Sequence, residues 1–246
     1  MLLTALLWLS GAVEGREEAA QPPVVGERLS FQGRWMGIPV GSGSIEVRGL
    51  VEIAGRSAYA IEAQGSSNKF LSTFYPIHDV IRCYLDTDTL QPLRFEKHQR
   101  EGHYRPEEVV TFDYTRRLAT YTSLLNHSVK EIPIPADVQD IIGAFYSLRR
   151  HATEPHTTLT LNIYSDEKVF RTEFRVGDAL ILELLRRGTF PSLLIEPRAN
   201  FRGVFVRRGR LWIYLSADAR RLPLFVRVAT PWGPMSGVID QSSLKK

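Results

Sequence analysis

The stretch RLSFQGRWMGIPVGSGSIEVRGLVEIAGRSAYAIEAQG, residues 28–65, carries the pattern that decides the fold. Apolar and polar residues alternate over RLSFQGRW, over SIEVRGLVEIA and over AYAIEAQG, which is typical of β-strands with one buried face. The intervening MGIPVGSG and GRS are rich in glycine and favour turns. This part of the chain therefore predicts consecutive antiparallel strands.

Strand patterns of this kind continue along the chain, for example over FLSTFYPIHDVIRCYLD, residues 70–86, which is strand-like apart from an interruption at Pro76. One segment clearly breaks the pattern. Residues 135–150, PADVQDIIGAFYSLRR, place apolar side chains at helical spacing after a proline. We therefore expect one amphipathic helix over about residues 136–150. The run GDALILELLRRG, residues 177–188, could form a short helix, but its glycines and the TFPSLLIEP that follows favour a hairpin. The predicted fold is mainly β: an antiparallel sandwich or a curved open barrel of roughly a dozen strands.

The first residues differ in composition from the rest. Residues 1–15 form an apolar segment that is short for a bilayer span, with small residues before a cleavage point, and predict a signal peptide. An uncleaved anchor is the alternative. We expect residues 16–25 to be a flexible lead-in and residues 26–241 a single β-rich domain. The protein is thus expected to be exported in a bacterium, and to be periplasmic or associated with the envelope.

Charge and cysteine content narrow the classes of partner. The formal net charge is +4, and arginine doublets recur in predicted turns. Such doublets serve solubility or face an anionic membrane surface; nucleic acid is not an expected partner because no recognition motif occurs. The single cysteine, Cys83, excludes an intramolecular disulfide and is expected to be a small buried residue.

The most polar predicted strand is LRFEKHQRE, residues 93–101. One face carries Leu93, Phe95, Lys97 and Gln99, so we expect the strand to leave the core as it proceeds. The other face can form charge pairs with a neighbouring strand, with Glu107, Glu108 and Asp113 as available acids. We assign the strand to a candidate interaction surface, and no catalytic residue, metal site or cofactor is predicted. The residues of this surface are Arg94, Glu96, Lys97, His98 and Arg100.

Several ordered blocks resemble a known family. GERLSFQGRWMGIPVGSGSIEV, VQDIIGAFYSLR, IEPR and GRLWIYLSADARRLPLFVRV are similar to the bacterial domain of unknown function DUF3108, over about residues 26–240. The resemblance implies an exported, mostly antiparallel β-protein of the envelope, and it implies no activity. The segment ALILELLRRGTFPSLL is more apolar than the family pattern, which leaves a ligand-facing role there open.

Three functions remain open at this point. The first is binding of a lipid or other hydrophobic ligand in a curved sheet, with the helix as a lid. The second is a structural or interaction module that binds an envelope protein, and the third is a glycan-acting enzyme. An enzyme is not expected, because no catalytic motif occurs. Neither the ligand nor the oligomeric state follows from the sequence. The candidate ligand-binding residues are Trp35, Phe74, Tyr75, Phe145 and Trp212.

Overall fold

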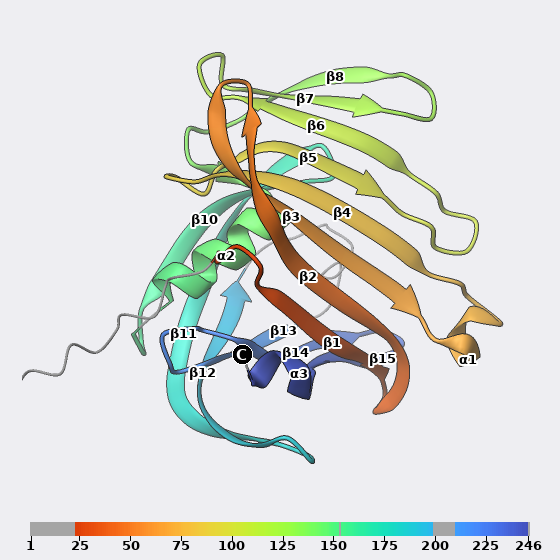
Figure 1. Ribbon diagram of the computed structural model, residues 1–246, viewed down its shortest axis with the longest axis vertical. Helices are drawn as coiled ribbons and strands as arrows, with labels where there is room; N and C mark the ends of the chain where they lie inside the picture. The colour runs from red at the N-terminus through yellow and green to blue at the C-terminus, as the bar shows by residue number, and fades with distance from the viewer. Residues whose placement is uncertain (1–22, 153, 199–209, 246) are drawn as a thin grey trace, which may run out of the picture.

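A computed structural model describes residues 23–152, 154–198 and 210–245. Within these ranges, fifteen strands form one sheet in the order β8-β7-β6-β5-β4-β3-β2-β1-β15-β14-β13-β12-β11-β10-β9. The sheet curls around helix α2 without closing into a barrel (Figure 1). The mainly β fold with an open, curved sheet is confirmed. The predicted signal peptide and most of the lead-in lie outside the described residues.

Neighbouring strands are antiparallel throughout, except that β9 pairs in parallel with β10. No helix in the described ranges is long and apolar enough to cross a membrane. The elements are β1 Arg28–Trp35, β2 Ile38–Ile53, β3 Arg56–Ser67, α1 Lys69–Ser72, β4 His78–Asp86, β5 Pro92–His98, β6 Glu107–Asp113, β7 Leu118–Ser123, β8 Val129–Pro133, β9 Val138–Gln139, α2 Ile141–His151, β10 Thr158–Ser165, β11 Lys168–Leu184, β12 Gly188–Arg198, β13 Leu211–Ser216, β14 Pro223–Thr230, β15 Gly233–Ile239 and α3 Gln241–Leu244.

Helix α2 lies in the middle of the core. Ile142 and Tyr146 pack among the buried residues of β2 to β7, whereas Ala144 and Leu148 pack on β10 to β13. Phe145 touches the first of these clusters and also the cluster formed by β1, β11, β14 and β15. A helix normally buries one stripe against one layer. Here α2 fills the inside of the curl and joins its two halves.

The start of α2 is set by a buried aspartate. Asp140 has extended backbone angles, and its Oδ1 accepts a hydrogen bond from the Gly143 amide, so it is the N-cap. The helix therefore begins at Ile141, later than the expected residue 136, because Val138 and Gln139 pair with β10 as strand β9. The last turn carries Arg149, Arg150 and His151, which complement the helix dipole.

A buried arginine fastens the other end of α2. The Arg149 guanidinium is 1% exposed and donates to both oxygens of Glu27, at 2.6 and 2.7 Å. It also donates to the carbonyl oxygens of Arg220 and Arg221. Because a buried charge needs a full set of partners, this contact holds the helix, the start of β1 and the β13–β14 turn in one arrangement.

Two local expectations have different outcomes. The segment before Pro76 was expected to be strand-like, but residues 69–72 form helix α1, whose N-cap Asn68 accepts from the Leu71 amide. The GDALILELLRRG segment does form a hairpin: β11 runs to Leu184, and β12 begins at Gly188. The hairpin was predicted correctly from its flanking glycine and proline. The segment before Pro76 forms a helix and not a strand because Asn68 caps its first turn.

Candidate functional site

The outer face of β1 to β5 carries a ladder of alternating charges. Along this face, Glu46, Glu62 and Glu96 pair with arginines of their own or a neighbouring strand, with nitrogen–oxygen distances of 2.7–3.8 Å. We call this set the ion-pair ladder; its arginines are Arg28, Arg48, Arg82 and Arg94. Charge pairing across strands is confirmed for Glu96, which lies 3.8 Å from Arg82 of β4. Arg94 instead pairs with Glu96 of its own strand, and of the acids expected as partners on this face, Glu107 of β6 lies 3.9 Å from His98.

The opposite face of β5 does not leave the core as expected. Leu93 and Phe95 are followed by Lys97 and Gln99, which are only 9% and 8% exposed. Lys97 is tolerated because its ammonium group lies 2.9 Å from Glu108 and 3.4 Å from Asp166. Burial opposes its charge, but these acids outweigh that effect and raise its pKa. The prediction was wrong here because the β10–β11 turn folds over this end of the strand.

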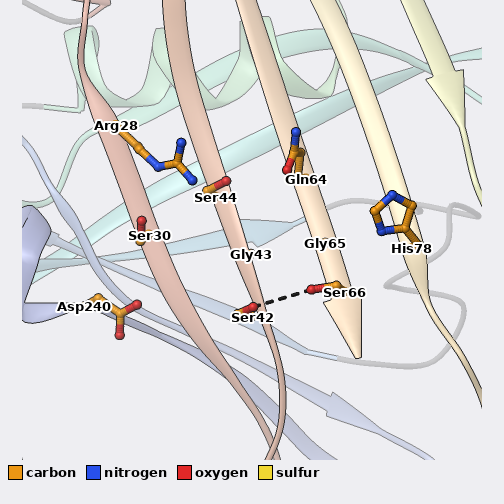
Figure 2. A pocket seen from close by; sticks show the side chains of 10 residues that line it. All are labelled: Arg28, Ser30, Ser42, Gly43, Ser44, Gln64, Gly65, Ser66, His78 and Asp240. Carbon is orange, nitrogen blue, oxygen red and sulfur yellow. Dashed lines mark hydrogen bonds between the residues drawn. The ribbon is translucent and has the colours of Figure 1, made fainter. Parts of the chain in front are cut away.

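A polar trough lies on the outer face below the ladder (Figure 2). It has a volume of about 280 Å³. Serine hydroxyls from three neighbouring strands line it, and Figure 2 shows Arg28, Gln64 and His78 around them, with α2 behind the strands. Gly43 and Gly65 leave part of its floor as bare backbone. We call this the serine trough; its serines are Ser30, Ser42, Ser44 and Ser66.

Large apolar side chains are exposed at one end of the sheet. The β1–β2, β3–β4 and β5–β6 connections share this end, and the β14–β15 turn joins them because Trp35 pairs with Met235. Trp232 is 78% exposed and Phe74 75% exposed. We call this surface the aromatic rim; it consists of Trp35, Met36, Ile38, Phe70, Phe74, Tyr75, Tyr104 and Trp232.

Hydrogen bonds and ring contacts link these connections into one continuous surface. The Trp35 indole donates to the Trp232 carbonyl at 3.0 Å, and Asn68 donates to the Pro39 carbonyl at 2.8 Å. Phe70 and Phe74 meet edge to face, with ring centroids 6.0 Å apart. The Tyr75 ring packs so closely on Gly102 that a Cβ there would lie 2.9 Å from it. The rim therefore runs from the β14–β15 turn past α1 to the β5–β6 loop, along the right-hand side of Figure 1.

The charged residues within the rim are mostly cations. Lys69, Arg100 and Arg105 are exposed and form no ion pair among the described residues. The acidic residue of the same loops is Glu101. The side-chain amide of Gln99 donates to the carboxyl groups of both Glu101 and Asp79. Burial and the neighbouring Asp79 raise the pKa of Glu101 to about 7. A protonated Glu101 removes one negative charge, so the rim is basic at and below neutral pH.

The five predicted ligand-binding aromatics do not gather around one cavity. Trp35, Phe74 and Tyr75 lie in the rim, whereas Phe145 packs inside the core. Trp212 lies on β13 between the guanidinium groups of Arg210 and Arg227, 5.4 and 5.8 Å from its ring. The structure thus brings three of them to one surface and leaves two apart.

Sequence reasoning missed most of the rim and the whole trough. Met36, Tyr104 and Trp232 lie in connections between strands, and Phe70 lies in the short helix α1, so they follow no strand periodicity. Ile38 was also missed, and it stands at the first position of β2. A signal was present in RWMGIP, NKFLSTFYP and TPWGP, where large apolar residues stand beside glycine or proline. Turns are normally polar, so such residues mark a surface with a partner.

Comparison with known proteins decides the family. Residues 30–240 match the family described as Protein of unknown function (DUF3108). The chain belongs to the DUF3108 family. No curated protein matches it.

A solved structure supports the same fold for this DUF3108 protein. The crystal structure of a β-barrel-like protein of domain of unknown function DUF1849 from Brucella abortus is similar, with a TM-score of 0.57 and 10% identity. The alignment covers 89% of this chain and 98% of that one. At this identity the likeness concerns the fold alone.

The buried thiol of the DUF3108 chain has a structural partner. The Cys83 thiol donates to Asp140 Oδ2 at 2.6 Å, and burial together with this carboxylate raises the pKa of the thiol. Such a thiol is inert as a nucleophile. In the described ranges no group of three or more His, Cys, Asp or Glu side chains is placed to hold a metal ion. The rim, the trough and the ladder are the exposed surfaces that offer contacts for recognition.

Proposed function

We propose that this DUF3108 protein is a non-catalytic protein of the bacterial cell envelope that docks with its aromatic rim onto an anionic membrane surface. The observation that carries the proposal is the contiguous set of exposed Trp, Tyr and Phe side chains on linked turns. Aromatic residues with one apolar and one polar end are favoured at the membrane–water interface. Export, as predicted from residues 1–15, would bring the protein to such a surface.

Charge complementarity favours a membrane over a neutral partner. Lys69, Arg100 and Arg105 lie among the rim aromatics, and each cation near an anionic leaflet adds roughly 1 kcal/mol of attraction. In this proposal the acyl chains contact the rim and do not enter beneath α2, because Ile142, Ala144 and Tyr146 of that helix already pack into the core. The lid function expected of the helix is thereby disfavoured.

The test is co-sedimentation with vesicles of phosphatidylcholine, with and without phosphatidylglycerol. We expect binding to the anionic vesicles, and the double variant Trp232→Ser/Phe74→Ser should weaken it at least about tenfold, since tenfold is 1.4 kcal/mol. The matched control is Ile181→Ser/Leu185→Ser, which removes two equally exposed apolar side chains away from the rim.

Three outcomes decide the proposal. Loss of binding in the rim variant alone supports docking through the rim. Equal loss in the control variant, or equal binding to neutral and anionic vesicles, contradicts it. If the wild-type protein binds no vesicle, the proposal is also contradicted. The rim would then be interpreted as a docking surface for an envelope protein.

A further inference from the structure

The serine trough carries chemistry that the rim does not. Its lining consists of hydroxyl, amide, imidazole and charged groups, so it offers hydrogen bonds and little apolar contact. The hydroxyls of Ser30 and Ser44 have no hydrogen-bond partner within the described residues, and those of Ser42 and Ser66 are only 3.5 Å apart. These groups can donate to and accept from a bound molecule.

The charges in the trough are already engaged. Arg28 pairs with Glu46 at 2.7 Å, and Asp240 lies 3.5 Å from Arg187. The cation Arg28 and the anion Asp240 each have a partner of opposite charge. The lining therefore has no strong preference for a charged ligand. Neutral hydroxyl groups are the ligand chemistry that such a surface matches best, because each hydroxyl both donates and accepts.

The position of the trough relates it to the rim. Ser42 follows Ile38 of the rim by four residues, and Ser66 precedes Phe70 of the rim by four. At about 3.3 Å per residue along a strand, Ser42 lies roughly 13 Å from Ile38. The polar headgroup layer of a leaflet is about 5–8 Å thick. A rim seated beneath the headgroups would thus hold the trough just above this layer, where it faces the headgroups from the water side.

We propose that the serine trough binds the polyhydroxylated headgroup of a membrane lipid, such as one bearing glycerol or sugar hydroxyls. This inference rests on the proposed membrane docking. In this arrangement the rim supplies the apolar contact, the rim cations face lipid phosphates, and the trough selects headgroups that carry several hydroxyls.

Two vesicle types of equal negative charge separate headgroup recognition from docking. One contains phosphatidylglycerol, which presents two free hydroxyls, and the other contains phosphatidylserine, which presents none. The variants Ser42→Phe and Ser66→Phe fill the trough from exposed positions, and Thr111→Phe places the same ring on an exposed outer position of β6. Circular dichroism confirms folding of each variant.

We expect the wild type and Thr111→Phe to bind phosphatidylglycerol vesicles about tenfold more tightly than phosphatidylserine vesicles. Ser42→Phe and Ser66→Phe should bind both at the lower level. Equal affinity of the wild type for the two vesicles overturns the headgroup assignment and leaves rim docking intact. A preference for phosphatidylglycerol that persists in both trough variants has the same consequence. Absence of binding to either vesicle overturns the docking proposal and the headgroup assignment with it.

Discussion

The space around α2 and the aromatic rim follow opposite rules. Around α2, even charged groups such as Arg149 and Asp140 are buried, and each is met by several partners. At the rim, large apolar groups such as Trp232 and Phe74 are left in solvent. The first arrangement serves a single folded state, whereas the second gives no benefit to the isolated protein. Substitutions around α2 should therefore change the unfolding free energy, and substitutions in the rim should change membrane binding, each without the other.

The largest effect should come from Arg149. Replacing it with alanine leaves Glu27 without its cation and two backbone carbonyls without a donor, so we expect a loss of about 3–5 kcal/mol in unfolding free energy. The control is Arg82→Ala in the ion-pair ladder, where an exposed pair should cost less than about 1 kcal/mol. Urea unfolding measures both, and equal losses would contradict the contrast between buried and exposed pairs.

A smaller loss is expected at the helix start. Asp140→Ala removes the N-cap and the acceptor of the Cys83 thiol, which should lower stability by about 1–2 kcal/mol. Asp140→Asn keeps a capping oxygen and should recover most of this loss in the same urea experiment. If both variants lose the same stability, the cap is not what fixes the start of α2.

Protonation of Glu101 should change the local stability of the rim and leave the core around α2 unchanged. Burial first, and then Asp79, raise its pKa from 4.5 to about 7, so its stabilising contribution is present below 4.5 and is lost as the pH rises through 7. Hydrogen exchange of the Tyr104 amide, which donates to the Glu101 carbonyl, should therefore gain protection at low pH after correction for intrinsic exchange rates. Glu101→Gln should flatten this dependence, and a slope that persists in this variant would assign it elsewhere.

The smallest effect on stability is expected from the rim itself. Trp232→Ser/Phe74→Ser removes exposed side chains, so the unfolding free energy should change by no more than about 0.5 kcal/mol per site. Urea unfolding beside the vesicle assay checks this. A loss of several kcal/mol would mean that the rim is part of the fold, and reduced vesicle binding could then not be read as lost docking.

Alternation in residues 28–65 predicted the strands because a strand with one buried face must repeat every two residues. The same logic failed at Lys97, since one of its partners, Asp166, lies in a distant turn, and at Gln99, whose amide is engaged by Asp79 and Glu101. The site was harder to predict. The rim is built from four turns, and the trough from small residues on neighbouring strands. Neither has a period in the sequence, so only the curl of the sheet brings their members together.

The central claim is that the rim, and not the rest of the surface, meets the membrane. The most direct measurement uses two variants that each keep a single tryptophan, Trp232 in one and Trp212 in the other. Every other tryptophan is replaced by phenylalanine, so that the rim keeps its aromatic side chains, and the vesicles contain phosphatidylglycerol and brominated lipids. We predict a blue shift and strong quenching of Trp232, and no change for Trp212, which is held between Arg210 and Arg227. Unquenched Trp232, or equal quenching of the two, would contradict the account.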